Sequence, residues 1–199
     1  MADLNMRELF LARNTVIQML RDRGCDLNQE TFETYDAFLS TFTTENPSAC
    51  NLICSKENKS IAVHFTLPEK MQKKMIEQII TDYSSQNVSR LVLVVVNKLN
   101  HATLAYLTKL SIQVEIFLYK ELLFNPTLHY LVPKQRIMAE DESQQLLKRL
   151  KCNKEDLPVM LKSDIIARYL GGEVEDIVEI NRRSKTAGES KYYRVIKGV

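Results

Sequence analysis

The chain has 199 residues, of which 45% are apolar and 26% are charged, and its formal net charge at pH 7 is only +2. This is the composition of a globular protein and excludes a fibrous or disordered chain. The small net charge excludes a histone-like polycation, so any contact with nucleic acid must come from a local basic patch. The longest apolar run, Leu91 to Val96, is far shorter than the roughly 20 residues that cross a bilayer. Charged residues interrupt the N-terminal segment, which therefore lacks the continuous apolar core of a signal peptide. We therefore expect no membrane contact.

Helices and strands are expected to alternate over residues 1–124. Apolar stripes of helical period mark three amphipathic segments: Met6–Leu20, Phe32–Phe42 and a segment that opens at Pro68 and ends at Tyr83. A shorter helix is expected over Leu104–Leu110. Strand patterns occupy four segments: Asn51–Ser55, Ile61–Phe65, Leu91–Val96 and Ile112–Leu118. Lys56 to Lys59 is predicted to form a hairpin turn, and the later order of strand, helix, strand, helix, strand predicts a parallel sheet with Leu91–Val96 at its centre.

The pattern changes after Asn125-Pro126-Thr127, where we place a domain boundary. Residues 125–199 are predicted to form a small α+β domain. Its helices are expected at Glu140–Lys151 and at Ile165–Leu170, the latter capped by Asp164 and ended by Gly171. An irregular segment is expected from Leu157-Pro158. Two strands are expected, Ile177–Ile180 and Tyr192–Ile196, joined by a polar loop around Thr186-Ala187-Gly188.

The four cysteines do not have the spacing of a disulfide framework: Cys25, Cys50, Cys54 and Cys152. We expect reduced thiols, as in an intracellular compartment. Cys50 and Cys54 with His64 could be part of a zinc site, but no second ligand pair follows at a suitable spacing. We therefore predict neither a metal nor a cofactor.

Five short sequence blocks follow one another in the last seventy residues. They are His129-Tyr130-Leu131-Val132-Pro133, Leu157-Pro158, Ser163 to Gly171, Asp176 to Ile180, and a closing block of Arg182, Ser184, Thr186-Ala187-Gly188 and Tyr193-Arg194-Val195. In this order and spacing they resemble the fifth subunit common to eukaryotic DNA-directed RNA polymerases I, II and III, a family that also has archaeal members. The resemblance continues more weakly in the N-terminal half, where Arg21-Asp22-Arg23-Gly24 closes the first helix. Archaeal members resemble the C-terminal domain alone, so the chain resembles the two-domain eukaryotic form, which large viruses can also carry.

The resemblance implies an α/β N-terminal jaw domain with a restriction-endonuclease-like sheet over residues 1–124, and an α+β C-terminal assembly domain over residues 125–199. It further implies a non-catalytic polymerase subunit that docks on the largest subunit, contacts other subunits and lies near downstream DNA, in the nucleus or, for a viral copy, in a cytoplasmic factory or virion. The residues that it places at the partner interface are His129, Val132, Pro133, Asp164, Arg168, Arg182, Ser184, Thr186, Gly188, Tyr193 and Arg194. The chain departs from the family at Ile165, where the family has Pro, and near Glu175, where it has Gly.

The closing block has a physical interpretation of its own. Gly188 is predicted to take a positive φ between two strands, and Ser184 and Thr186 can satisfy loop amides. The fork of Arg182 suits a carboxylate or backbone carbonyls of a partner. The alternative is that the block only folds a hairpin. The basic residues that follow Arg182 can likewise be a solvated face or can meet an acidic surface of a large subunit.

Lysines mark a possible contact with DNA in the N-terminal half. Ligands often bind at the carboxyl ends of parallel strands, which makes the loop after Val96 the natural contact point. We therefore place near DNA, in weak and non-specific contact, a set of six residues: Lys73, Lys74, Lys98, Asn100, His101 and Thr103. A solvated face is the alternative. In the family, a DNA-facing Thr-Pro-Ser-Ala segment aligns with Asn100–Thr103, which keeps none of those residue types.

Two other functions are alternatives to a polymerase subunit. A Mg²⁺-dependent nuclease needs an Asp and a Glu-x-Lys on adjacent strands, but the one candidate, Glu57-Asn58-Lys59, falls on a predicted turn. An autonomous nucleic-acid-binding regulator that borrowed the polymerase-subunit domain is the other alternative. Co-migration with a large complex would distinguish a subunit from such a regulator.

Overall fold

The computed structural model describes residues 6–27, 31–42, 47–56, 59–66, 73–110, 112–184 and 188–198. The chain divides into two compact units, Met1–Phe124 and Asn125–Val199, each of which is described by itself. None of the helices in the described ranges is long and apolar enough to span a membrane.

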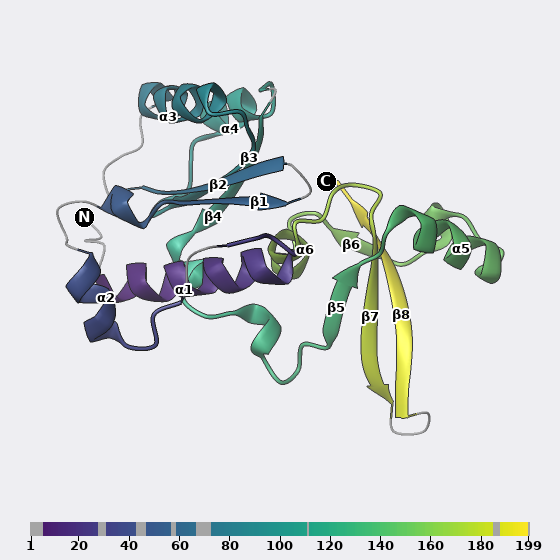
Figure 1. Cartoon of the computed structure of the whole chain (residues 1–199). Helices are drawn as coiled ribbons and strands as arrows, with labels where there is room; N and C mark the ends of the chain where they lie inside the picture. The colour runs from purple at the N-terminus through teal and green to yellow at the C-terminus, as the bar shows by residue number, and fades with distance from the viewer. Residues whose placement is uncertain are drawn as a thin grey trace. The chain divides into compact units, whose positions relative to one another are not determined.

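The N-terminal unit is built on a four-stranded sheet (Figure 1). Its strands, in spatial order, are β1 (Leu52–Lys56), β2 (Lys59–Phe65), β3 (Val88–Val95) and β4 (Gln113–Leu118). β1 and β2 form an antiparallel hairpin, whereas β2, β3 and β4 run parallel. The predicted parallel sheet is therefore confirmed, and its central strand is β3, in which Leu91 to Val95 are all buried.

Helices cover this sheet. They are α1 (Met6–Asp22), α2 (Tyr35–Thr41), α3 (Lys73–Ser85) and α4 (His101–Leu107). Ile76 and Ile80 of α3 and Leu107 of α4 pack against Ala62 and Leu91 of the sheet. Figure 1 shows α1 on the side of the sheet away from α3 and α4, so the strands are enclosed between helices. The predicted start of the third helix at Pro68 lies outside the described residues.

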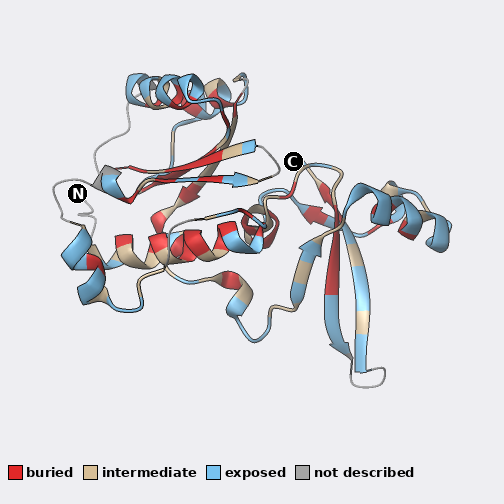
Figure 2. Cartoon of the chain, in the orientation of Figure 1, coloured by how far each residue is buried: buried red, intermediate tan, exposed pale blue. Residues whose placement is uncertain are grey.

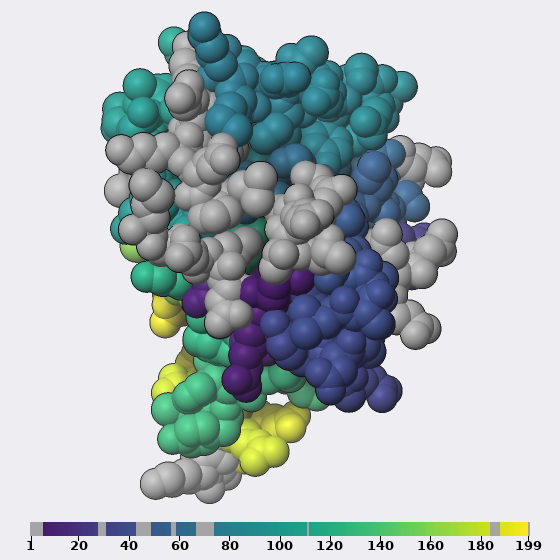
Figure 3. All heavy atoms as spheres, turned by 90° about the vertical axis from the view of Figure 1, so that its left-hand side faces the viewer, coloured from purple at the N-terminus to yellow at the C-terminus, as the bar shows by residue number. Residues whose placement is uncertain are grey.

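The second helix is shorter than its sequence pattern predicts because Thr34 ends the preceding segment. Its hydroxyl accepts a hydrogen bond from the Ala37 amide (3.3 Å), which makes it the N-cap of α2. Phe32 therefore precedes the helix, yet its ring packs edge-on against Phe38 with centroids 5.5 Å apart. Figure 3 shows the indigo α2 segment in contact with the purple α1, where aromatic packing against Phe10 joins the two helices.

The C-terminal unit holds a second four-stranded sheet in the order β5-β7-β8-β6. The strands are β5 (Lys134–Ile137), β6 (Val159–Leu161), β7 (Ile177–Ser184) and β8 (Gly188–Lys197). β7 and β8 form a long antiparallel hairpin, β5 adds antiparallel to β7, and β6 adds parallel to β8. Two helices complete the unit: α5 (Glu140–Leu150) and α6 (Ile165–Leu170).

Each face of this sheet packs against a different helix. Val178 and Ile180 join a core with Ile166 of α6, whereas Ile177 joins a core with Leu146 of α5. Successive residues of a strand point to opposite faces, so odd and even positions of β7 belong to different cores. Figure 2 shows buried residues in the first half of β7 and exposed residues toward its outer end, where β7 pairs with β8 alone.

The C-terminal sheet departs from the sequence prediction at each of its four strands, and β8 begins at Gly188 and not at Tyr192. β5 was not expected, and β6 forms in the segment predicted to be irregular, because parallel pairing with the distant Val195 to Lys197 gives its three residues their strand structure. β7 extends to Ser184 rather than ending at Ile180, since four further pairs of the ladder order a polar stretch that lacks apolar alternation. Ser184 is therefore the last residue of a strand, paired with Gly188, and not a loop residue.

Candidate partner-binding surface

The segment from Leu128 to Leu131 exposes large apolar side chains. Leu128 is 74% exposed, Tyr130 86% and Leu131 69%. The His129 ring stacks on Tyr130 with centroids 5.0 Å apart, and its Nδ1 accepts a hydrogen bond from the Leu131 amide (3.2 Å). These contacts order His129 and Tyr130 locally, and an exposed apolar cluster of this kind is a typical sign of a binding surface.

The exposed segment is fixed to the unit at both ends. Before it, the side-chain amide of Asn125 donates to the hydroxyl of the buried Tyr169 in α6 (2.8 Å). The side-chain carbonyl of Asn125 in turn accepts from the Thr127 amide (2.9 Å). After it, Val132 packs against the core that contains Ile166. A surface fixed in this way loses little conformational entropy when a partner binds.

Arg182 and Arg194 lie on the face of the hairpin that carries the α6 core. The register places Val178 opposite Arg194 and Ile180 opposite Tyr192, so all four point to one side. The Arg182 guanidinium lies 5.5 Å from the centroid of the exposed Tyr192 ring. This cation–π contact orients a planar group whose N–H donors lie in its plane, the geometry that binds carboxylates or carbonyls.

The opposite face carries a chain of ion pairs around Glu179. Its buried carboxylate accepts from Arg136 Nε and from Lys191 Nζ, each at 3.1 Å, and Arg136 also binds Glu142 of α5 at 2.6 Å. Burial alone would raise the pKa of Glu179, but hydrogen bonds from Lys191 and Arg136 outweigh burial and hold that pKa below its usual value. These contacts tie β5, β7, β8 and α5 together and are structural.

Tyr193 belongs to this second face and not with Arg182 and Arg194. Its ring packs against the core under α5, and its hydroxyl accepts from Arg149 (3.3 Å). Sequence order groups Tyr193 with Arg194, but the alternation of a strand separates neighbours. The predicted interface set is therefore divided between two faces of the sheet.

The remaining predicted interface residues have diverse surroundings. Gly188 has the predicted positive φ, +70°, and an added Cβ would meet none of the described atoms within 4 Å. Asp164 caps α6, since its Oδ1 accepts from the Ile166 amide (2.8 Å). Arg168 on α6 and Pro133 are half-buried. Thr186 lies outside the described residues, as does the Ser184 side chain.

Tyr130 and Leu131 were not among the predicted interface residues, although the family resemblance implied their neighbours His129, Val132 and Pro133. A signal was present: four apolar or aromatic residues in six positions, with neither helical nor strand period, between Pro126 and Pro133. A run without either period does not fit the single buried face of a helix or strand.

In the N-terminal unit, the predicted DNA-proximal residues lie at one edge of the sheet. α3 follows β2 and the loop with Lys98 follows β3, so the first turn of α3 and this loop share the carboxyl edge of the parallel strands. Lys74 and Lys98 are exposed there. The Lys73 side chain is outside the described part of the chain.

The other three residues of that set form the start of α4. The Asn100 side chain accepts from the Thr103 amide (2.8 Å) and is the N-cap of the helix. His101 is exposed. Thr103 is buried, so its side chain supports the loop and is not available for direct contact with DNA.

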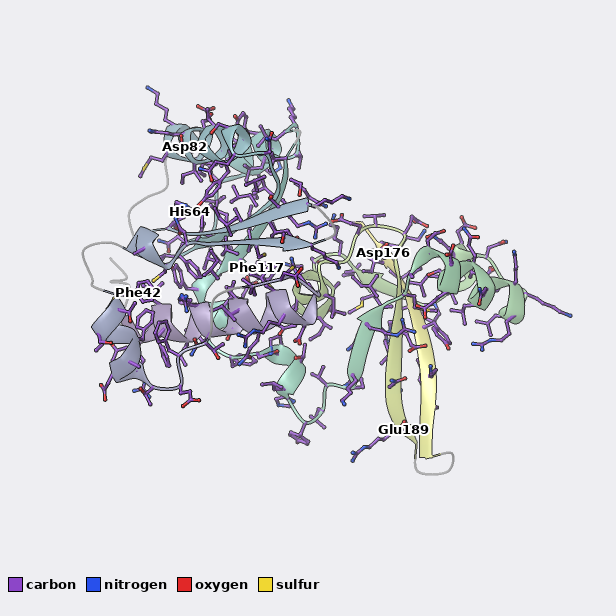
Figure 4. The ribbon with its side chains drawn as sticks, viewed as in Figure 1. Phe42, His64, Asp82, Phe117, Asp176 and Glu189 are labelled. Atoms are coloured by element: carbon purple, nitrogen blue, oxygen red, sulfur yellow. The ribbon has the colours of Figure 1, made fainter. Side chains whose placement is uncertain are left out.

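Polar clusters elsewhere in the N-terminal unit have structural explanations. His64 Nδ1 lies 3.1 Å from the Asn51 amide nitrogen and 3.2 Å from the Tyr83 hydroxyl, and burial lowers its pKa. Figure 4 shows His64 on its strand with Asp82 on the helix above it. Within the described residues no three His, Cys, Asp or Glu side chains are grouped to hold a metal. Glu57 and Asn58 of the nuclease-like triplet lie outside them.

Comparison with known families gives two matches that together cover most of the chain. Residues 3–83 match the family described as RNA polymerase Rpb5, N-terminal domain, and residues 124–196 match RNA polymerase Rpb5, C-terminal domain.

Individual relatives agree. The DNA-directed RNA polymerases I, II, and III subunit RPABC1 of Caenorhabditis briggsae is 31% identical over 98% of this chain and 98% of its own length. The DNA-directed RNA polymerase V subunit 5C of Arabidopsis thaliana is 30% identical over 97% of this chain and 85% of its own. The archaeal DNA-directed RNA polymerase subunit Rpo5 of Archaeoglobus fulgidus is 46% identical over 34% of this chain and 90% of its own.

Proposed function

This chain belongs to the Rpb5 family of RNA polymerase subunits, and from that premise we propose that its C-terminal unit anchors it to the largest subunit of a multisubunit polymerase. The N-terminal unit is then the jaw, near downstream DNA. The chain itself has no catalytic role in this proposal, and we place it in the nucleus, or in a viral factory or virion if the gene is viral.

The exposed apolar segment carries the proposal for the anchor. Tyr130 and Leu131 present apolar surface that water solvates poorly, and burying one such side chain contributes roughly 1.5–3 kcal/mol. Binding energy usually concentrates in a few aromatic and arginine residues of this kind. Val132 and Ile180 share the core beneath α6, so the segment and the Arg182 face of the hairpin are supported by the same packing.

Lysines at the carboxyl edge of the N-terminal sheet support the proposal for DNA. Lys74 and Lys98 are exposed at that edge. The N-terminal unit has the element order strand, helix, strand, helix, strand, and on that order we also propose a restriction-endonuclease-like sheet. Isolated lysines make phosphate contacts without base recognition, so the interaction is weak and salt-dependent.

The experiment that tests the anchor is purification of the tagged full chain under mild conditions from its natural source. We expect co-migration with the largest polymerase subunit in a complex of several subunits. Migration of the chain as a free monomer bound to nucleic acid would instead support the autonomous regulator.

We propose that the two units are also separate folding domains. A chain beginning at Asn125 is expected to melt cooperatively, because its two cores are each made by residues of that unit. If it folds only when residues 1–124 are added, the two units share one cooperative core.

A further inference from the structure

Two cysteines of the N-terminal unit meet where the chain leaves α1 and reaches β1. Gly24, with φ +76°, ends the helix, and the Cys25 amide then donates to the Leu20 carbonyl (3.0 Å). The Asp26 amide donates to the carbonyl of Ser55 in β1 (2.8 Å), which forms an isolated antiparallel bridge.

This pairing brings the two thiols together. Because Asp26 and Ser55 are partners, the preceding residues Cys25 and Cys54 both point to the other side of the bridge, diagonal to each other. The Cys54 thiol donates to the Ile61 carbonyl of β2 (3.6 Å), and its proximity to Cys25 shifts the pKa of both thiols. Both are buried, at 7% and 5% exposure, and both are free thiols. Neither has a part in the proposed interface.

The charges around the pair favour a thiolate. The Cys54 thiol can turn from the Ile61 carbonyl to donate to a Cys25 thiolate, and this lowers the pKa of Cys25; burial opposes the shift, and the positive charges of Arg23, Lys56 and Arg90 lower the pKa further. The hydrogen bond to Cys25, and then burial, raise the pKa of Cys54. The pair therefore loses one proton readily and holds the second.

Glu115 is the counter-charge at this site. It pairs with Arg23 at 2.7 Å and with Arg90 at 2.7 Å. Its negative charge therefore offsets part of the effect of these arginines on the pKa of Cys25, but the ion pairs keep both guanidinium groups in position.

We propose that Cys25 and Cys54 are a redox-active dithiol that a peroxide converts to a disulfide. The Cys25 thiolate attacks a peroxide oxygen, the O–O bond breaks, and hydroxide leaves with the proton lost from Cys25, giving water and a sulfenic acid. The Cys54 sulfur then attacks the sulfenic sulfur, the S–O bond breaks, and the Cys54 proton leaves with the hydroxyl as a second water. Two thiols are oxidised by two electrons and one hydrogen peroxide is reduced to two waters.

The disulfide would close a loop that contains α2 and its aromatic contacts with α1. Closing a loop of this length removes conformations from the unfolded chain, so the unfolding midpoint of the N-terminal unit is expected to rise by roughly 10 °C on oxidation. This proposal is independent of the interface assigned to the C-terminal unit.

The test treats the reduced full chain with hydrogen peroxide at pH 7, followed by iodoacetamide and mass mapping without reductant. No Lys or Arg lies between Arg23 and Lys56, so cleavage at Glu and at aromatic residues is needed to separate Cys25 from the peptide that holds both Cys50 and Cys54. Fragmentation of that peptide in the mass spectrometer then shows which of its two cysteines is cross-linked. We expect a Cys25–Cys54 cross-link that dithiothreitol reverses, while Cys50 and Cys152 are recovered alkylated. Burial raises the pKa of Cys50 to about 11, so without peroxide Cys25 is expected to be alkylated about tenfold faster than Cys50.

Matched variants assign the steps. Cys54→Ser is expected to stop at the Cys25 sulfenic acid, which dimedone traps, and to lose the thermal shift. Cys50→Ser is expected to keep both the cross-link and the shift. The proposal is overturned if Cys25 and Cys54 are recovered as separately alkylated thiols after peroxide, or if Cys50 or Cys152 is oxidised preferentially. The mass map of the unsubstituted chain decides this even if a variant fails to fold.

Discussion

The two units expose different kinds of side chain at the surfaces proposed to bind partners. The C-terminal unit presents large apolar side chains, Tyr130 and Leu131, together with an arginine held on an aromatic ring. The N-terminal unit presents single lysines, Lys74 and Lys98, at the edge of its sheet. Binding energy from buried apolar surface does not depend on charge screening, whereas the attraction of exposed charges is screened within about 10 Å at 0.1 M salt. This difference supports the proposal that the C-terminal unit serves assembly and that the N-terminal unit makes a weak, salt-dependent contact.

The largest effect is expected from a charge placed in the apolar segment. Leu131→Asp is expected to weaken binding to the largest subunit by roughly 30- to 1000-fold, because a docked aspartate would be desolvated without a partner. Affinity capture of the polymerase with purified variant chains measures the loss. Leu150→Asp is the matched control, since Leu150 is also exposed, at 46%, but lies at the end of α5. Equal losses for both variants would remove the special role of the segment.

A second test separates the two faces of the hairpin. Arg182→Glu is expected to weaken the same interaction by about 30-fold, as reversal of a charge paired across an interface does. Arg183→Glu should have little effect, because the neighbouring residue points to the opposite face. If Arg183→Glu is the more damaging variant in the capture assay, the α5 face is the docking face.

A third prediction concerns stability and pH. Because hydrogen bonds hold the folded-state pKa of Glu179 below its unfolded value, its stabilising contribution is present above about pH 5 and is lost as pH falls through the folded pKa. Glu179→Gln is expected to reduce the free energy of unfolding by about 1–3 kcal/mol at pH 7, and to flatten its decline below about pH 5. Denaturant unfolding from pH 3 to 7, with hydrogen exchange in β7 as a local probe, measures both.

In Glu179→Gln the free energy of unfolding should still decline somewhat at low pH, and this remaining decline serves as a control. The pKa values of Glu142 and Glu175 are also lowered, by hydrogen bonds from Arg136 and Lys197 respectively, so some acid sensitivity should remain in Glu179→Gln. An unchanged pH profile in the variant would show that Glu179 contributes nothing to acid sensitivity.

The smallest effect is expected in the N-terminal unit. Lys98→Glu should leave assembly intact and reduce by about one the slope of log affinity for duplex DNA against log salt concentration. The control is Lys109→Glu, because the exposed Lys109 follows α4 and lies toward the amino edge of the parallel strands. Loss of the complex in Lys98→Glu would reverse the assignment of the two surfaces.

Elements with a strong local pattern were predictable, and those made by distant pairing were not. The run Leu91 to Val95 predicted a central strand because its apolar, β-branched residues need cover on both sides. β6 has only three residues and exposes two of them, Val159 and Leu161, so nothing local distinguishes it from a loop. Its structure depends on β8, which lies much later in the chain.

The sequence predicted many of the residues that belong to the candidate site, but not on which face of the hairpin each of them lies. Gly188 was expected to have a positive φ, and it does. The division between Arg182 and Tyr193 depends on the hairpin register, which the sequence of a polar ribbon specifies weakly. Glu175 shows the reverse case: it has φ +76° near the position where the family has Gly, and its carboxylate binds Lys197 at 2.7 Å.

The two-faced β7–β8 hairpin limits the kinds of change that evolution can make in it. A substitution alters one side chain, but insertion of a single residue within β7 rotates every later residue by half a turn and exchanges the two faces. Arg182 would then point toward the α5 side, and a neighbouring residue would take its proposed partner-binding position. Lineages of this chain should therefore vary in residue type along the ribbon while keeping the number of residues between Ile177 and Gly188 constant, or changing it by two.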